Sequence, residues 1–238
     1  MFARKSTPEE IRRRFDADVE RFSNIETGQS ATIDAPLSLE LIAQAARGVR
    51  PDAAALLDIG CGAGNYTLKL LRHLPLRSVT LIDLSRPMLD RAVERIGAAA
   101  PDVAVTAIQG DIRETQLPAE AFDVAVAAAT LHHLRDDREW RDVFGAVHRA
   151  LLPGGSFWIS DLVAHQSPAV QDVMWRRYGE YLASLQGDAY RDRVFAYIDA
   201  EDTPRPLVWQ LDLLARTGFR SVEVLHKNSC FAAFGAVK

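Results

Sequence analysis

The residues with the clearest chemical meaning in this chain are one acid and three alternating glycines that follow an apolar run. They lie in the segment Leu57-Asp58-Ile59-Gly60-Cys61-Gly62-Ala63-Gly64. Glycine allows positive φ and lets a ligand approach the main chain closely, and the helix expected next presents unpaired N–H groups. We therefore predict a strand-to-helix turn that binds a small, partly anionic ligand. A glycine triplet alone is also compatible with a tight turn that holds no ligand.

Two further acids follow apolar runs. Asp83 lies at the end of residues 78–84, and Asp111 follows residues 103–109. An acid about 20 residues after a glycine loop also occurs in nicotinamide-binding Rossmann units, where it binds the ribose. Asp58, however, suits a ligand with an ammonium and a sulfonium and would repel a pyrophosphate, although it could also hold the N–H groups of its own loop. Because Asp111 would add a carboxylate beside the adenine amine, the acids favour S-adenosylmethionine over NAD.

The histidine pair His132-His133 follows the apolar run at residues 122–128. An unperturbed imidazole pKa of about 6.5 suits a general base, which a transfer reaction needs when its acceptor loses a proton. Packing at the start of a helical turn would explain the pair equally simply. We do not interpret two neighbouring histidines as a metal site, and the sequence predicts no metal.

Strand and helix patterns alternate from residue 54 onward, which predicts an α/β fold with parallel strands. The expected parallel strands are residues 54–59, 78–84, 103–109, 122–128 and 156–161. Helices are expected to residue 74, after the cap Ser85, and at residues 137–152, with Pro153-Gly154-Gly155 as the next turn. Strands 221–225 and 230–237 are joined by a short turn and must be antiparallel neighbours, so the sheet ends in a hairpin.

Helical segments flank this core. Thr7, Pro8 and Glu10 predict a capped helix to about residue 21, whose basic cluster Arg12-Arg13-Arg14 is interpreted as a solvated face. A polar loop or lid and a helix at residues 37–46 would follow. We predict a single domain of four parts: an N-terminal helical lid (1–50), a cofactor-binding core (51–161), a helical insertion (162–203), and a last helix with the hairpin (204–238).

Composition is that of an ordinary globular protein. Of 238 residues, 48% are hydrophobic and 25% are charged, and a formal net charge of −4 gives no general attraction to nucleic acid. No apolar run approaches the roughly 20 residues of a membrane span, and the N-terminus lacks the features of a signal peptide. The two cysteines make neither a disulfide framework nor a metal cluster. We expect a cytoplasmic protein, and homodimerisation is left open.

Five motifs, in order and at matching spacing, resemble those of the class I S-adenosylmethionine-dependent methyltransferases over residues 37–238. They are Leu57-Asp58-Ile59-Gly60-Cys61-Gly62-Ala63-Gly64, Ile82-Asp83-Leu84-Ser85 with Met88, Gly110-Asp111-Ile112, Phe122-Asp123-Val124 running to Leu131-His132-His133-Leu134, and Leu151-Leu152-Pro153-Gly154-Gly155. The resemblance implies a doubly wound, Rossmann-like mixed sheet of seven strands ordered 3-2-1-4-5-7-6. Strand 7 would be antiparallel, with the ligand at the carboxyl ends of the strands.

The resemblance also implies roles for residues on the methionine side of S-adenosylmethionine. Main-chain N–H groups of the glycine loop would hold the methionine part, with the loop comprising Gly60, Cys61, Gly62 and Gly64. The main chain near Ala128 would line the side of the sulfonium, and Asp58 completes this set. S-adenosylhomocysteine would be the product.

On the nucleoside side, the resemblance implies that Asp83 accepts both ribose hydroxyls. Leu84 and Met88 would pack on the adenine, whose amine would be bound by Asp111 and whose ring would contact Ile112. Asp83 and Asp111 also have simpler interpretations as a helix cap and a turn residue, and Met88 as a core residue.

A second resemblance, to the carboxy-S-adenosylmethionine synthases of tRNA wobble-uridine modification, extends to both ends of the chain. It includes Phe15-Asp16 through Phe22, Leu41-Ile42-Ala43, Gly218-Phe219, Cys230-Phe231 and Phe234-Gly235. In that family an arginine of the inserted region contacts the carboxylate of the cofactor. Arg193 is the nearest candidate, with Arg191 two residues away, although residues 188–203 depart from the family in sequence and length.

The first interpretation is methyl transfer from S-adenosylmethionine to a small-molecule acceptor by direct in-line displacement. His133 and Arg193 would lie on the acceptor side, between the nucleotide pocket and the aromatic lid. The alternatives are a carboxy-S-adenosylmethionine synthase-like enzyme and a non-catalytic S-adenosylmethionine-binding protein. The sequence identifies neither the acceptor nor the attacked atom.

Overall fold

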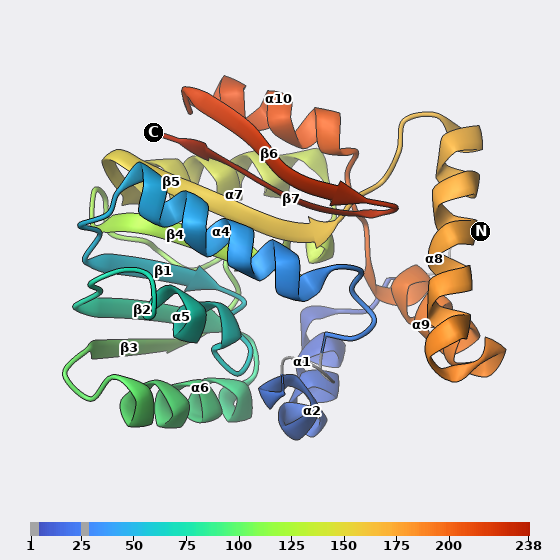
Figure 1. Ribbon diagram of the computed structural model, residues 1–238, viewed down its shortest axis with the longest axis horizontal. Helices are drawn as coiled ribbons and strands as arrows, with labels where there is room; N and C mark the ends of the chain where they lie inside the picture. The colour runs from blue at the N-terminus through green and yellow to red at the C-terminus, as the bar shows by residue number, and fades with distance from the viewer. Residues whose placement is uncertain (1–4, 25–28) are drawn as a thin grey trace.

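The computed structural model describes residues 5–24 and 29–238, so residues 1–4 and 25–28 of the predicted lid lie outside the described residues. In the described part, seven strands form one sheet in the order β3-β2-β1-β4-β5-β7-β6 (Figure 1). They are β1 (Ala55–Ile59), β2 (Ser78–Asp83), β3 (Ala104–Gln109), β4 (Phe122–Ala128), β5 (Leu151–Leu162), β6 (Ser221–Asn228) and β7 (Phe231–Val237). The first five pair in parallel, and β7 is antiparallel to β5 and β6. The predicted topology is confirmed.

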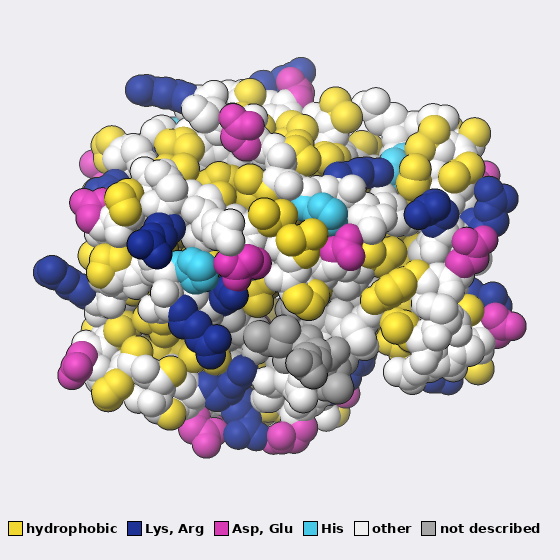
Figure 2. All heavy atoms as spheres, viewed as in Figure 1, with side chains coloured by type: hydrophobic (Ala, Val, Ile, Leu, Met, Phe, Trp, Pro, Cys, Tyr) yellow, Lys and Arg dark blue, Asp and Glu magenta, His cyan; other side chains and the backbone are white. Residues whose placement is uncertain are grey.

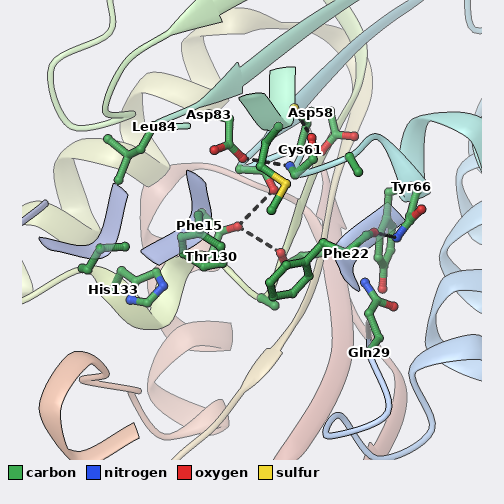
Figure 3. A pocket seen from close by; sticks show the side chains of 18 of the residues that line it. Phe15, Phe22, Gln29, Asp58, Cys61, Tyr66, Asp83, Leu84, Thr130 and His133 are labelled. Carbon is green, nitrogen blue, oxygen red and sulfur yellow. Dashed lines mark hydrogen bonds between the residues drawn. The ribbon is translucent and has the colours of Figure 1, made fainter. Parts of the chain in front are cut away.

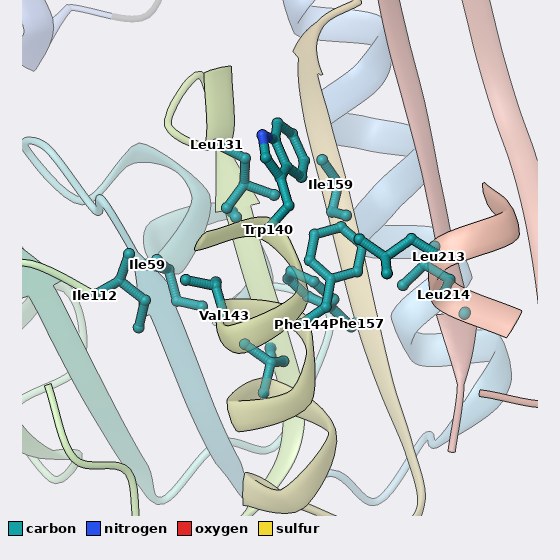
Figure 4. Close-up of a cluster of buried hydrophobic side chains, with 14 of the residues drawn as sticks. Ile59, Ile112, Leu131, Trp140, Val143, Phe144, Phe157, Ile159, Leu213 and Leu214 are labelled. Carbon is teal, nitrogen blue, oxygen red and sulfur yellow. The ribbon is translucent and has the colours of Figure 1, made fainter. Parts of the chain in front are cut away.

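Helices cover both faces of the sheet, which explains the continuous apolar character of its central strands. One face packs against α7 (Asp137–Ala150) and α10 (Leu207–Thr217). The other packs against α4 (Ala35–Val49), α5 (Asn65–Leu70) and α6 (Arg86–Ala99). Figure 4 shows aromatic side chains of α7 and β5 packed beside leucines of α10. This double core fixes the strand ends at which ligand-binding groups are expected.

Four further helices gather beyond the ends of the parallel strands, where their arrowheads point in Figure 1. They are α1 (Pro8–Ala17), α2 (Val19–Ser23), α8 (Pro168–Gln186) and α9 (Asp188–Glu201). A separate apolar cluster, which includes Tyr178, Leu182 and Ile198, attaches α8 and α9 to the end of β5. The sheet therefore has a helical cover at its carboxyl edge.

The single helix predicted to residue 21 is divided at Asp18, between α1 and α2. Residues seven positions apart on a continuous helix are separated by about 10 Å along its axis. The break instead brings the ring centroids of Phe15 and Phe22 to 5.5 Å from each other. The capping box of Thr7 and Glu10, in contrast, forms as predicted.

Other predicted boundaries also change. Helix α4 extends beyond 37–46 at both ends, and α5 stops at Leu70 instead of residue 74. The predicted turn Pro153-Gly154-Gly155 lies inside β5, where the register with β4 shifts. A Cβ atom on Gly155 would lie 2.9 Å from the carbonyl oxygen of Asp123, so the glycine permits a bulge against the neighbouring strand.

The surface carries charges of both signs. Figure 2 shows basic, acidic and apolar side chains distributed over the face that α4 and α5 cover. Within residues 5–24 and 29–238, no helix has the length and apolarity needed to cross a bilayer.

Candidate functional site

The glycine loop between β1 and α5 has a conformation that favours glycine. Gly60, Gly62 and Gly64 have φ values of 65°, 50° and 82°, in the region where a Cβ atom is penalised. At Gly60, a Cβ atom would also lie 2.1 Å from Oγ1 of Thr130. At Gly62 nothing lies within 4 Å of such an atom. The loop is thus packed on one side and open on the other.

Several main-chain N–H groups of this loop are engaged inside the protein. Those of Gly60 and Cys61 donate to the carbonyl oxygen of Ile82, at 2.7 and 3.1 Å. That of Gly62 donates to Oδ2 of Asp83 at 2.8 Å. The predicted use of these N–H groups as ligand donors is therefore revised, because in this conformation the glycines provide space for a ligand while their N–H groups hold the loop to β2.

Two acids beside the loop are held by neutral donors. Asp58, which is 1% exposed, accepts a hydrogen bond from the hydroxyl of Thr67 at 2.6 Å, and not from the N–H groups of the loop. Asp83 also accepts from the N–H of Ser85 at 2.9 Å. Burial raises the pKa of Asp58 to about 7 and that of Asp83 to about 6. A cationic or hydroxyl-bearing ligand would stabilise their ionised forms.

A pocket of about 140 Å³ adjoins the loop and the two acids (Figure 3). The predicted site residues that line it are Asp58, Gly60, Cys61, Gly62, Asp83, Leu84, Met88, Ala128 and His133. Gly64 instead forms the N-cap of α5, where a Cβ atom would lie 3.2 Å from that of Ala92. We call this space the loop pocket. It brings together most of the residues that the sequence predicts on the cofactor side.

Asp111 and Ile112 line a smaller adjoining pocket of about 60 Å³, which shares Gly60, Asp83 and Leu84 with the loop pocket. Burial by itself raises the pKa of Asp111, but hydrogen bonds and the charge of Arg113 outweigh it and lower that pKa. The guanidinium of Arg113 contacts both oxygens of Asp111. The carboxylate is therefore already paired where the sequence suggested a free acceptor for the adenine.

The N-terminal helices form the opposite wall of the loop pocket. Ile11 and Phe15 of α1 and Phe22 of α2 line it. The carbonyl oxygen of Phe22 accepts a hydrogen bond from the side-chain amide of Asn65 at 2.9 Å, which ties α2 to the start of α5. The sequence gives Phe15 and Phe22 no role in the pocket, because nothing local marks them as pocket residues.

A buried group that we call the His–Asp cluster lies beside this wall and comprises His132, His133, Asp161 and Asp202. The 3-10 helix η1 (Leu131–His133) carries the histidines, β5 carries Asp161, and Asp202 follows α9. Nδ1 of His132 contacts Oδ1 of Asp161. Oδ1 of Asp202 lies 3.6 Å from Nε2 of His132 and 3.4 Å from Nδ1 of His133. The four side chains therefore form one continuous set.

The two histidines have opposite electrostatic environments. Burial lowers the pKa of His132, but the charges of Asp161 and Asp202 outweigh this and raise it to about 9. Burial lowers the pKa of His133 well below its usual value, and the neighbouring His132 lowers it further. Burial also raises the pKa of Asp202 to about 6. The neutral imidazole of the pair is thus His133, which lines the loop pocket.

A second space of about 330 Å³, which we call the cavity, lies under α8 and α9. Its aromatic lining consists of Phe15, Phe22, Tyr178, Tyr190, Tyr197 and Phe231. His132, Asp161 and Asp202 line the cavity as well. Its shape and lining suit a planar, partly apolar molecule with polar groups at one end.

Three arginines also line the cavity, but they differ in their partners. Arg14, expected on a solvated face, instead donates to Glu201 and to the hydroxyl of Tyr197, each at 2.8 Å. Arg21 lies 3.6 Å from Asp18. Arg193 lies over the ring of Tyr190, 5.7 Å from its centroid.

Arg191 is the alternative arginine of the insertion. It pairs with Asp188 and Asp192 on its own helix, at 2.9 Å in both cases. Of the two candidates, Arg193 is therefore the one that the structure places at the cavity.

Sequence reasoning missed two acids of the site. Asp161 is the penultimate residue of β5 and the last residue of the strand predicted at 156–161, so an acid at the end of a parallel strand was an available signal. Asp202 follows a helix of the insertion and carries no comparable local mark. Its place beside His132 results from tertiary packing.

Comparison with known proteins gives a family for the central segment. Residues 56–155 match the family described as a methyltransferase domain. An uncharacterised methyltransferase of Mycobacterium tuberculosis is 33% identical over 120 residues, which are 50% of this chain and 55% of that protein. The chain thus spans about half the length of this relative. A carboxy-S-adenosylmethionine synthase of Hydrogenovibrio crunogenus is 28% identical over 192 residues, covering 77% of this chain and 72% of the synthase.

Solved structures share the fold. One is the 1,6-didemethyltoxoflavin-N1-methyltransferase of Burkholderia thailandensis, determined with bound 1,6-didemethyltoxoflavin and S-adenosylhomocysteine. It superposes with a TM-score of 0.65 at 16% identity, covering 100% of this chain and 93% of that protein. At this identity the likeness concerns the architecture, including the helical cover of the sheet.

Proposed function

We propose that this chain, whose residues 56–155 belong to the methyltransferase-domain family, transfers a methyl group from S-adenosylmethionine to a small-molecule acceptor. The observation that carries the proposal is the continuity of two spaces. Phe15, Phe22, Thr32 and Ala129 line both the loop pocket and the cavity. A donor in the loop pocket would therefore lie next to an acceptor in the cavity.

The loop pocket suits S-adenosylmethionine. Asp83 uses two N–H donors, and a carboxylate has about four acceptor positions, so it retains capacity for ribose hydroxyls. Asp58 supplies a negative charge for the ammonium group, and Leu84 and Met88 supply apolar surface for the adenine. Asp111 would share its charge between Arg113 and the adenine amine, with Ile112 against the ring.

Bound S-adenosylmethionine supplies an activated methyl group, which an acceptor attacks in line as the carbon–sulfur bond breaks and its electron pair remains on sulfur. The chain contributes alignment and exclusion of water, and orientation can contribute about 7–11 kcal/mol. Ala129 lies at the junction of the two spaces and has a φ of 51°. Its N–H donates a hydrogen bond to the carbonyl oxygen of Ser160 at 2.8 Å, which fixes this conformation. This fixed main chain would help to hold the donor against the acceptor where the two spaces join.

The acceptor side comprises the cavity and the helical cover formed by the described residues of 1–50 and by residues 162–203. Aromatic rings on both segments suit a planar acceptor. Arg193 would pair with an acidic group of the acceptor, and His133 faces the side of the donor.

Calorimetry with S-adenosylhomocysteine and with NAD tests the cofactor. We expect binding of S-adenosylhomocysteine and none of NAD, since a pyrophosphate at the glycine loop would meet the carboxylate of Asp58. Methylated product from S-adenosylmethionine and a panel of aromatic acids would test the transfer. Binding of NAD alone would contradict the proposal.

A second candidate function is synthesis of carboxy-S-adenosylmethionine. The position of Arg193 favours it, because a guanidinium at the cavity could pair with an extra carboxylate on the cofactor. Mass spectrometry of the ligand that copurifies with the protein separates the two candidates. A carboxylated ligand would favour the synthase, and plain S-adenosylmethionine or S-adenosylhomocysteine would favour methyl transfer.

A further inference from the structure

We propose that His132, His133 and Asp202 form a binding site for a divalent transition-metal ion such as Zn²⁺, at the boundary between the loop pocket and the cavity. This site is independent of the proposed methyl transfer. His133 lines the loop pocket, whereas His132 and Asp202 line the cavity. A bound ion would consequently be accessible from the cavity.

The distances between the three donor atoms suit one ion. Tetrahedral bonds of about 2.0 Å place the ligand atoms about 3.3 Å apart. Oδ1 of Asp202 lies 3.6 and 3.4 Å from the nearest nitrogens of His132 and His133. The three donor atoms all lie within 4.8 Å of one another. Small side-chain adjustments would therefore complete the coordination.

Several of these atoms are buried without a hydrogen-bond partner. They are Oδ1 of Asp202 and both ring nitrogens of His133. Asp202 is only 5% exposed, and an unpaired buried carboxylate oxygen is costly. A metal ion would satisfy Asp202 and one nitrogen of His133 together, which the present contacts at 3.4 and 3.6 Å do not achieve.

Asp161 prepares His132 as a ligand. Its contact with Nδ1 fixes one ring proton on that nitrogen, so Nε2, which faces Asp202, is the atom that would bind the metal after releasing its own proton. Carboxylate–histidine–metal arrangements of this kind orient the ring and increase its basicity. Asp161 is itself fixed by the N–H groups of Leu131 and Leu162, at 2.8 and 2.7 Å.

The surrounding charges also permit a dication. Asp161 and Asp202 supply two carboxylates, and Arg14 is already paired with Glu201 at 2.8 Å. The other nearby cation, Arg135, donates to main-chain carbonyl oxygens of Ser6 and Glu201. Two imidazoles and one carboxylate are the donor set of catalytic zinc and non-haem iron sites, which keep open positions for water or substrate.

The test uses the full, tag-free chain, treated with EDTA and titrated with Co²⁺ while its visible absorption is recorded. We expect about one Co²⁺ per chain and at least a 10-fold loss of affinity in His133→Gln and in Asp202→Asn. His133→Gln breaks no side-chain hydrogen bond. His165→Gln is the matched control, because His165 bonds Gln171 outside the cluster, and it should bind as the wild type does.

Absence of Co²⁺ and Zn²⁺ binding by the wild type, or binding that survives in both variants, would overturn the proposal. Thermal melting checks that each variant is folded. A measurement on the unaltered chain covers the case in which neither variant folds: ¹⁵N imidazole NMR during a Zn²⁺ titration. Two of the six histidines, assigned to positions 132 and 133, should shift, and a shift of any other pair would also overturn it.

Discussion

The loop pocket and the cavity are neighbouring spaces with opposite construction. In the loop pocket, Asp58 and Asp83 are buried against neutral donors, and their pKa values are raised to about 7 and about 6. In the cavity, Asp161 is instead matched by the imidazole of His132. The first space thus leaves negative charge for a ligand to compensate, whereas in the second Asp161 has an internal partner and Asp202 keeps one oxygen without a hydrogen-bond partner.

The origin of the walls differs in the same way. The predicted residues of the loop pocket lie at or just after the ends of β1, β2 and β4, and α1 and α2 complete its wall. The cavity takes residues from α1 and α2 at one end of the chain and from α8, α9 and β7 toward the other. We infer that the loop pocket holds an invariant part of the reaction, the cofactor, while the cavity can change its acceptor through changes in the helical cover.

The largest expected effect is that of Gly60→Ala, which acts in the loop pocket. Its Cβ atom would lie 2.1 Å from Oγ1 of Thr130 at a φ of 65°. Strain and overpacking together should lower the free energy of unfolding by about 2–4 kcal/mol and abolish S-adenosylhomocysteine binding. Urea denaturation and calorimetry measure both.

Gly62→Ala is the matched control for that variant. Gly62 has a φ of 50°, but nothing lies within 4 Å of an added Cβ atom. Backbone strain alone should therefore lower the free energy of unfolding by about 1–2 kcal/mol. Equal losses in the two variants would contradict a role for the close contact with Thr130.

Asp83→Ala should weaken S-adenosylhomocysteine binding by 10-fold or more. Hydrogen bonds to a charged acceptor contribute about 1.5–3 kcal/mol each, and the loop would also lose its anchor at Gly62. Calorimetry measures the affinity. Asp90→Ala is the control, because Asp90 is an exposed acid that pairs with Arg86. An unchanged affinity would restrict Asp83 to capping the N–H groups of Gly62 and Ser85.

Arg193→Ala should affect the cavity alone. We expect about a 10-fold weaker affinity for a carboxylated cofactor or an acidic acceptor, with S-adenosylhomocysteine binding unchanged. Arg191→Ala is the control, since Arg191 pairs on its own helix. A parallel loss of S-adenosylhomocysteine affinity would mean that the two spaces are not separable in function.

The synthase and methyltransferase candidates differ already in the wild type. A synthase should bind carboxylated S-adenosylmethionine more tightly than the plain cofactor. The opposite order, measured by calorimetry, would leave Arg193 as an acceptor-side residue.

Asp58→Asn should change stability with an unusual sign. The pKa of Asp58 is raised from 3.8 to about 7, so the native state holds its proton more strongly than the unfolded state does, and ionisation lowers stability as pH rises toward 7. The shift corresponds to at most about 4 kcal/mol, so the variant should melt at a higher temperature than the wild type at pH 8. At pH 4, near the unfolded-state pKa, this gain should largely vanish.

The hydroxyl of Thr67 can still donate to the new amide oxygen, so the comparison isolates the charge. Differential scanning calorimetry at the two pH values checks it. No gain at pH 8 would mean that the protein already compensates the charge of Asp58, and that its two spaces differ less than we infer.

The sequence by itself determined the alternation of strands and helices and the glycine loop, because alternating apolar patterns specify parallel strands joined by helices. The strand order was implied only by the resemblance of its motifs to the class I S-adenosylmethionine-dependent methyltransferases. The positive φ of Gly60 and Gly62 is a local requirement of the main chain, so it is recorded directly in the residue type. The placement of Asp83 at a strand end follows from the same local pattern.

Only the tertiary structure decided the rest of the site. In the folded chain, Arg193 and not Arg191 lines the cavity, and Asp111 pairs with Arg113. Asp202, which follows a helix with no distinguishing motif, lies beside the histidines. These outcomes depend on which side chains become buried together when segments distant in sequence pack. Hydrogen bonds and desolvation at such contacts depend on the tertiary structure, so the spacing of residues in the sequence does not predict them.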